Sequence, residues 1–250
     1  MHIKIEKTKE HLGAKASSIG AQAIRDAIAN NGIANIILAT GASQFEMLNH
    51  LAKEQDIDWS KVNGFHLDEY IGIPMNHPAS FRLYLWKRFI SKLPVPMRSF
   101  YYINTEENPS KECDEIGNII RSLIIDVAFI GIGENSHIAF NDPPADFEIN
   151  DPYIIVDLDE DCRNQQLGEG WFTNIEEIPK RAVSMSVTQI MKSRKIICSV
   201  PDKRKAQAVK NSLRDSVSPN YPASILNTHD DCYLFLDDQS SSLINNNNEF

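Results

Sequence analysis

Several common signatures are absent from this 250-residue sequence. It contains neither a G-x-G-x-x-G with a following ribose-binding acid nor a G-x-x-x-x-G-K-[ST], so no nucleotide cofactor is indicated. The scattered cysteines argue against a metal clip and are typical of unpaired thiols in an intracellular protein. A formal net charge of −9 without a long basic run argues against nucleic acid or an anionic membrane surface as a partner. The cysteines are Cys113, Cys162, Cys198 and Cys232, and no C-x-x-C pair occurs.

Long apolar runs are also missing. No segment approaches the length that spans a bilayer, and Met1 to Lys7 lack the apolar region of a signal peptide. We therefore expect a soluble, cytoplasmic protein. The composition, with 42% hydrophobic and 24% charged residues, is ordinary for a globular protein. The length suits one large α/β domain or two small ones, with enough buried surface to fold without disulfides.

Short apolar runs that indicate strands alternate with periodic segments that indicate helices. Strands are expected at 2–6, 33–39, 62–67, 100–103, 124–130, 154–158, 195–200 and 233–236. Helices are expected at 12–29, from about 44, and at 81–90, 112–121, 206–213 and 222–226. The alternation predicts an α/β, modified Rossmann-like three-layer sandwich with a mainly parallel sheet. We expect one domain over 1–238 and a disordered tail over 239–250; 159–178 is either a lid-like segment or a surface loop.

One stretch joins a strand end to chemically able side chains. The apolar run 124–130 leads into Gly131 and Gly133, where the backbone can turn sharply or approach a ligand closely. His137 and Asp142 follow at once. Ligands of parallel α/β sheets lie beyond the carboxyl ends of strands, so this stretch is a candidate catalytic site. A glycine turn carrying a solvated histidine is the plain alternative.

A second strand end has the composition of an anion site. The run 33–39 stops at a turn of small residues, and a helix is expected to begin near Gln44. Free amides at the start of a helix attract anions, and small side chains let a ligand approach them. An ordinary capped turn, with a serine as its N-cap, is the alternative. The turn residues are Thr40, Gly41, Ala42 and Ser43.

The strand 62–67 ends in two acids, Asp68 and Glu69. If the extended geometry continues, His66 and Asp68 share one face of the strand. The acids could serve as a general base, as metal ligands or as part of a solvated turn. These three residues form no recognised ligand spacing, so no metal is expected.

These segments resemble the glucosamine-6-phosphate deaminase/isomerase family, which is related to the 6-phosphogluconolactonases. The resemblance covers nearly the whole domain, from Leu38 to Ser224. Its most specific parts are the run 67–70 (Leu-Asp-Glu-Tyr), the run 131–143 with both glycines, and Ile178-Pro-Lys-x-Ala182. The resemblance implies a Rossmann-like fold, no cofactor, and conversion of an amino-sugar 6-phosphate to the ketose 6-phosphate and ammonia. It also implies a small-molecule sugar phosphate as the partner, and either a single chain or a homo-oligomer.

The resemblance also assigns roles to individual residues. His137 matches the family's ring-opening histidine, Asp68 the base that moves a proton between C2 and C1, and Asp142 a family glutamate that orients the histidine. Lys205 matches a phosphate-binding lysine, whereas Lys203 and Arg204 are expected on a solvated face. Phosphate is expected at the turn of Thr40, Gly41, Ala42 and Ser43, with Gly133 beside it.

The sequence departs from the family pattern near the histidine and in the phosphate site. Many members carry Asp-Gly where this chain has Asn135-Ser136; Asn135 can still accept a hydrogen bond from the imidazole but brings no charge. Ser136 is costly if the position needs a positive φ. A family phosphate arginine aligns with Gly170, and Arg163 is a candidate replacement. Galactosamine 6-phosphate as substrate, a lactone hydrolase, and a non-catalytic sugar-phosphate binder stay open as alternatives.

Overall fold

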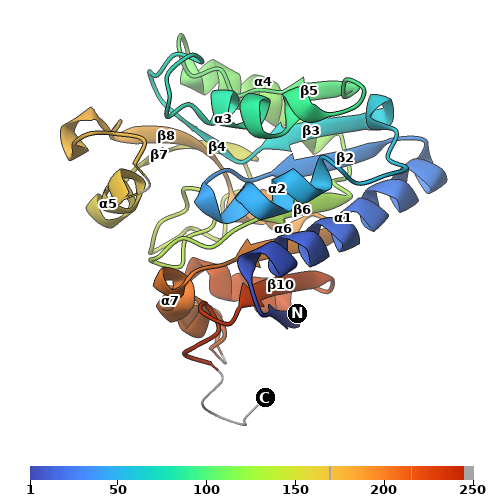
Figure 1. Ribbon diagram of the computed structural model, residues 1–250. Helices are drawn as coiled ribbons and strands as arrows, with labels where there is room; N and C mark the ends of the chain where they lie inside the picture. Colours follow the sequence, from blue (N-terminus) through green and yellow to red (C-terminus); the bar gives the residue numbers. More distant parts are fainter. Residues whose placement is uncertain (169, 215, 245–250) are drawn as a thin grey trace.

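The computed structural model describes residues 1–250 except 169, 215 and 245–250. Seven strands form a parallel sheet in the order β1-β10-β9-β6-β2-β3-β5 (Figure 1). Three further strands form an antiparallel sheet in the order β4-β8-β7. The fold therefore confirms the α/β architecture with a mainly parallel sheet.

The bounds of the elements are as follows. The strands of the large sheet are β1 His2–Glu6, β2 Ala34–Leu38, β3 Val62–His66, β5 Ser99–Tyr101, β6 Val127–Ile130, β9 Lys195–Val200 and β10 Cys232–Asp237. The small sheet contains β4 Asp68–Tyr70, β7 Tyr153–Asp157 and β8 Arg181–Met185. The helices are α1 Lys9–Asn31, α2 Phe45–Leu51, α3 Phe81–Arg88, α4 Pro109–Arg121, α5 Glu160–Gly168, α6 Val187–Met191 and α7 Ala206–Ser212. Short 3-10 helices are η1 Ala42–Gln44, η2 Trp59–Lys61, η3 Ile90–Lys92, η4 Ile175–Glu177, η5 Lys203–Lys205 and η6 Pro222–Thr228.

Two apolar cores cover the two faces of the large sheet. Alternate residues of β2 supply them, because side chains alternate across a strand: Ile36 and Leu38 enter one core and Ile37 the other. The first core is completed by α1, α2 and α3, and Figure 1 shows α1 and α2 lying across the front of the sheet. The second is completed by α4, α6, α7 and η6. The sandwich is thus held by apolar burial on both faces.

The strand order reverses at the centre of the large sheet. From β2 the chain moves outward to β3 and β5, then returns to β6 on the other side of β2 and continues outward to β9 and β10. The loops that leave β2 and β6 therefore separate, which opens a crevice at the carboxyl ends of these strands. All three strand ends selected from the sequence, those of β2, β3 and β6, lie at this edge.

The small sheet was not expected from the sequence. The segment 182–191 had no assigned structure; its first part belongs to β8 and its second forms α6. Between β3 and β4 the chain passes from one sheet to the other at Leu67, whose carbonyl accepts a hydrogen bond from the Met185 amide at 2.6 Å. Figure 1 shows the β7–β8 ribbon and α5 projecting from one side of the main body. The segment 159–178 accordingly contains a helix rather than a plain loop.

Two further boundaries differ from expectation. The strand 124–130 is shorter, because β6 begins only at Val127. The sequence predicted a disordered tail from residue 239, but that boundary is too early. Ser240 and Ser241 are buried, and the Ser240 amide donates to the Asp237 carboxylate at 2.7 Å. Residues 245–250, the rest of that tail, lie outside the described part of the chain. The single domain over 1–238 stays a prediction.

Candidate active site

The crevice holds an open cavity with an empty volume of about 580 Å³. Segments that follow β2, β3, β6 and β9 line it, together with α5. Most of the residues singled out from the sequence meet here: Asp68, His137, Thr40, Gly41, Ser43, Gly133 and Lys205 all line this one cavity. Ala42, Asn135 and Asp142 are not among the lining residues.

The turn after β2 is shaped by its glycine and held by a buried glutamine. Gly41 has φ +91°, a conformation that disfavours other residues, and its carbonyl accepts a hydrogen bond from the Tyr84 hydroxyl at 2.8 Å. The Gln44 side-chain amide donates to the carbonyls of Ile130 and Ser199, both at 3.3 Å. Gln44 therefore ties the turn to the ends of β6 and β9. Sequence patterns did not reveal this role, since a single glutamine after a turn carries no signal.

The expected N-cap at Ser43 is wrong. Ser43 lies inside η1, and α2 starts at Phe45 with no side-chain cap. The Ser43 hydroxyl instead accepts a hydrogen bond from the Gln44 side chain at 3.1 Å and lines the cavity. The turn thus presents hydroxyl and backbone groups rather than a capped helix end, which still suits an anion.

Asp68 reaches the cavity from the first residue of β4, whereas His66 and Glu69 do not line it. The expected common face of His66 and Asp68 is wrong, because β3 ends at His66 and β4 belongs to the other sheet. His66 is buried, and its Nε2 accepts a hydrogen bond from the Ile103 amide at 2.8 Å. Burial, followed by the nearby Arg82 charge, lowers the pKa of His66 to about 3.

Glu69 is a structural residue. Its carboxylate is fully buried and accepts hydrogen bonds from the Ser80 hydroxyl, at 2.8 Å, and from the backbone amides of Phe81 and Arg82. The Arg82 side chain completes the group with Nε at 3.1 Å. Burial raises the pKa of Glu69 despite these donors. Glu69 holds the start of α3 against β4 and does not line the cavity.

His137 is held by a carboxylate and by its own loop. Its Nδ1 lies 3.0 Å from Asp142 Oδ1, and both side chains are more than nine-tenths buried. Burial alone would raise the pKa of Asp142, but hydrogen bonds from His137 and Asn135 and the charge of His137 lower it overall. An ionised Asp142 beside Nδ1 fixes the ring orientation.

Asn135 acts on the carboxylate rather than on the imidazole. Its side-chain amide donates to Asp142 Oδ1 at 3.1 Å, and its side-chain oxygen accepts from the His137 backbone amide at 3.2 Å. The expected hydrogen bond from the imidazole to Asn135 is therefore replaced by the contact of the ring with Asp142. Asn135 therefore links the Asp142 carboxylate to the backbone of His137.

At two backbone positions around His137 the conformation or the available space restricts which residue can stand there. A Cβ at Gly133 would lie 2.3 Å from His137 Nε2, so only glycine lets the ring sit there. Ser136 has φ +73°, which confirms that a non-glycine residue occupies a left-handed conformation at this position. The backbone of the buried Ser136 is fixed at both its groups: the carbonyl accepts a hydrogen bond from the Ala223 amide at 2.9 Å, and the amide donates to the Gly133 carbonyl at 3.1 Å.

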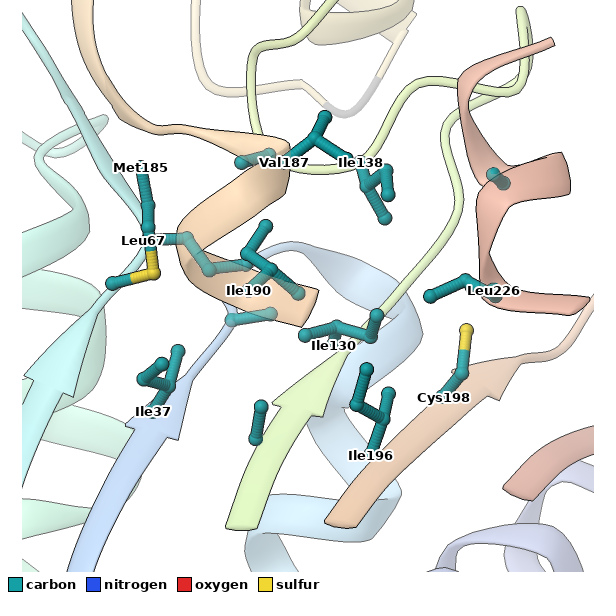
Figure 2. Packing of buried hydrophobic residues seen from close by; sticks show 14 of the residues in the cluster. Ile37, Leu67, Ile130, Ile138, Met185, Val187, Ile190, Ile196, Cys198 and Leu226 are labelled. Atoms are coloured by element: carbon teal, nitrogen blue, oxygen red, sulfur yellow. The ribbon is translucent and has the colours of Figure 1, made fainter. Parts of the chain in front are cut away.

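The residues next to Asp68 and His137 in the chain anchor them in the core. Leu67 and Ile138 are buried in the same apolar cluster, and Figure 2 shows them on either side of Val187 and Ile190 from α6. Burying such side chains contributes roughly 2 kcal/mol each. Apolar packing one residue away therefore sets where the two polar side chains emerge.

The cationic side of the cavity contains Lys205 and also Arg204. Lys205 is buried. Arg204 is exposed, as expected, with its side chain 36% exposed, but it also lines the cavity. Arg163 does not replace the family arginine: its Nη2 donates to the carbonyls of Ile175 and Ile178, at 2.5 and 3.4 Å, and Arg163 is not among the lining residues.

Helix α5 contributes a wall that sequence reasoning did not identify. Gln165 and Gln166 line the cavity. The Gln165 side-chain oxygen accepts a hydrogen bond from the Glu134 amide at 2.8 Å, and that of Gln166 accepts one from the Tyr70 hydroxyl at 2.7 Å. Both glutamines therefore link α5 to segments next to Gly133 and Asp68. Polar residues of a helix without a clear apolar stripe gave no signal for this.

Two groups of side chains in the described part of the chain have the composition of a metal site. His137, Asp142 and Cys162 bring one ligand atom each within 4.8 Å of the others, as do the more exposed Glu10, Glu46 and His50. Burial strongly raises the pKa of Cys162, so its thiol is protonated and a poor ligand. The contact between His137 and Asp142 is explained by the pairing of the imidazole Nδ1 with the carboxylate at 3.0 Å.

The sequence and the fold were compared with known proteins. The family described as glucosamine-6-phosphate isomerases/6-phosphogluconolactonase matches residues 7–234. A glucosamine-6-phosphate deaminase of Oenococcus oeni is 33% identical over 244 residues, 98% of this chain and 99% of that protein. One of Bacillus pumilus is 30% identical over 248 residues, 97% of this chain and 100% of that protein.

Solved structures agree with these matches. A structure described as a monomeric glucosamine-6-phosphate deaminase superposes with a TM-score of 0.89 at 28% identity, covering 97% of this chain and 100% of that one. The 6-phosphogluconolactonase of Trypanosoma brucei shares the fold, with a TM-score of 0.76 at 17% identity over 96% of this chain and 97% of that one. The chain belongs to the glucosamine-6-phosphate isomerase/6-phosphogluconolactonase family.

Proposed function

We propose that this protein is an isomerising deaminase that converts an amino-sugar 6-phosphate to the corresponding ketose 6-phosphate and ammonia; the first candidate substrate is glucosamine 6-phosphate, which gives fructose 6-phosphate. The observation that carries the proposal is the convergence of Asp68, His137 and Lys205 on one cavity with the turn after β2. Relatives over 97% or more of the chain are named glucosamine-6-phosphate deaminases. Lactonases resemble this chain in fold at 15–17% identity, which favours the deaminase over the lactone hydrolase.

The proposed reaction begins with ring opening by His137. Because Nδ1 faces Asp142, the ring exchanges protons with the substrate through Nε2. The imidazole passes a proton from the C1 hydroxyl to the ring oxygen, which breaks the C1–O5 bond and gives the open-chain aldehyde. Asp142 keeps the ring oriented, and Asn135 orients Asp142 in turn.

Asp68 then acts as the general base. Its carboxylate takes the proton from C2, the electron pair forms the C1–C2 double bond, and the C1–O1 double bond becomes a single bond as O1 takes a proton from the C2 ammonium, which gives a neutral enolamine. Return of a proton to C1 gives the iminium at C2, and addition of water followed by loss of ammonia gives the ketose. Overall, one water enters and one ammonia leaves, so no oxidant is needed. The phosphate is bound by Thr40, Gly41, Ser43 and Lys205, while Ala42 shapes the turn and Gly133 admits the imidazole.

The direct test compares substrates. Purified protein is incubated separately with glucosamine 6-phosphate, galactosamine 6-phosphate and 6-phosphogluconolactone, and ammonia release and lactone hydrolysis are measured. Ammonia from either amino sugar, faster than from a heat-inactivated control, supports the proposal and fixes the C4 stereochemistry. Lactone hydrolysis without ammonia supports the hydrolase, and saturable binding without product supports the non-catalytic binder.

The setting of the reaction is part of the proposal. We place it in the cytoplasm, because phosphorylated sugars are charged and are retained there. Among the described residues, no helix combines the length and apolarity needed to cross a membrane. Size-exclusion chromatography with light scattering would decide between a single chain and a homo-oligomer.

A further inference from the structure

The cavity carries two strong cations, which differ in their surroundings. Among the described residues that line it, Arg204 and Lys205 are the only Lys or Arg. Lys205 is 4% exposed, whereas Arg204 stands at the rim with its side chain 36% exposed. A phosphate monoester carries roughly −1.5 to −2 charges near neutral pH. One lysine therefore balances only part of the ligand's charge.

Arg204 has a competing partner on the loop that carries the histidine. Arg204 Nη1 lies 3.5 Å from Glu134 Oε1, and the Glu134 side chain is 38% exposed. The Glu134 backbone is fixed by its own hydrogen bond to Gln165 of α5. A long contact between half-exposed groups is weak, and a guanidinium has five donors, so the arginine can exchange this partner for a phosphate.

Arg204 also lies at the boundary of a second cavity. This neighbouring space has an empty volume of about 830 Å³ and is lined by Glu134, Asp161 and Gln165 among others. Arg204 and Gln165 line both spaces. The guanidinium therefore stands between an acidic side, at Glu134 and Asp161, and the anion turn. A dianion in the first cavity would draw it toward the turn.

We propose that Arg204 is a second phosphate ligand of the substrate site and that Glu134 competes with the phosphate for it. Arg204 thereby supplies a planar donor group beside the point charge of Lys205. Glu134 weakens phosphate binding, and its removal strengthens it. The inference rests on the proposed function only in taking the bound anion to be a phosphate.

The test measures phosphate binding without catalysis, by a ³¹P NMR titration of the full chain with inorganic phosphate. Arg204→Gln is expected to raise the dissociation constant about tenfold, because a charge-assisted hydrogen bond is lost. Lys203→Gln is the matched control: it removes the same charge one residue away, outside the cavity, and is expected to change the constant less than about twofold. Glu134→Gln is expected to lower the constant by about two- to fivefold.

The double variant Arg204→Gln/Glu134→Gln separates competition from general electrostatics. If Glu134 acts through Arg204, the gain from Glu134→Gln disappears in the Arg204→Gln background; if it persists, the competition is overturned. Equal dissociation constants for Arg204→Gln and Lys203→Gln would overturn the role of Arg204. Circular dichroism and the melting temperature check folding. A wild-type protein that binds phosphate through Arg204 but releases no ammonia would refute the proposed function and keep this inference.

Discussion

The two sheets contribute differently to the cavity. The large parallel sheet supplies the anion turn after β2, the His137 loop after β6 and the cations after β9, all at a place where its topology opens a crevice. The small antiparallel sheet supplies Asp68, and α5 beside it supplies Gln165 and Gln166. The proposed acid–base pair is thus divided between the sheets. The hydrogen bond from the Met185 amide to the Leu67 carbonyl fixes the position of β4 at the end of β3. The relative placement of the two sheets therefore sets the distance between Asp68 and His137.

The largest expected effect tests the contribution of the small sheet. Asp68→Asn removes the proposed base but keeps the size of the side chain. We expect the rate of ammonia release to fall about 1,000-fold, because a positioned general base contributes roughly 10²–10⁴ to a rate. Inorganic phosphate binding should persist, since the anion turn belongs to the other sheet. The exposed Asp238→Asn serves as the control, and undiminished turnover of Asp68→Asn would reject the role of the base.

The next effect tests the His137 loop of the large sheet. Asp142→Asn keeps the position of an oxygen near Nδ1 but removes the negative charge of the carboxylate beside the ring. We expect kcat to fall about 100-fold, with the KM changed far less, because the residue acts through the histidine. The pH profile of kcat should shift as well. The exposed Asp146→Asn is the matched control, and an unchanged pH profile in Asp142→Asn would contradict the positioning role.

The third prediction concerns His66, the last residue of β3, before the chain passes to the small sheet. The free energy of unfolding should decrease at acid pH because of this residue. His66 has a pKa of about 3 in the folded protein against 6.5 as a free side chain. Between these values the unfolded chain binds a proton that the folded chain does not, so stability is full above pH 6.5 and falls as the pH is lowered. The loss between pH 6.5 and 5 amounts to about 2 kcal/mol.

The measurement for His66 is urea denaturation at several pH values. His66→Gln keeps an acceptor for the Ile103 amide but does not titrate, so its stability should depend less on pH than that of the wild type. The exposed His11→Gln should retain the wild-type slope. Identical slopes for His66→Gln and the wild type would show that this histidine is not buried in its neutral form.

The smallest expected effect concerns backbone strain in the His137 loop. Ser136→Gly relieves the positive φ of +73°, at a cost in unfolded-state entropy, for a net gain of about 0.5 kcal/mol in the free energy of unfolding. Ser122→Gly is the matched control, because Ser122 has φ −82° and its replacement should destabilise the protein. Thermal melts of both variants measure the difference. A loss of stability in Ser136→Gly would mean that its side-chain contacts outweigh the strain.

The parts of the site that followed from the sequence are those with a local cause. Apolar runs that end in small or polar residues gave the strand ends at Thr40, Asp68 and Gly131, because a buried parallel strand is a continuous apolar run. The parallel sheet follows from alternation of strands and helices. The small sheet did not follow, because β4 is three residues long and β7 and β8 pair across distant parts of the chain. The roles of Gln44 and Gln165 and the place of Arg204 on the cavity were missed for the same reason.

The sequence by itself determined that this chain folds as a layered α/β protein and that its polar, chemically able residues stand at strand ends. Both properties depend on short-range patterns of burial and on the preferences of glycine and small residues. Only the tertiary structure decided that His66 is sealed in the core while Asp68 enters the cavity, that Asn135 binds Asp142, and that Arg204 lines the same cavity. Those outcomes depend on how two sheets and α5 pack together, and packing depends on contacts between residues far apart in the chain.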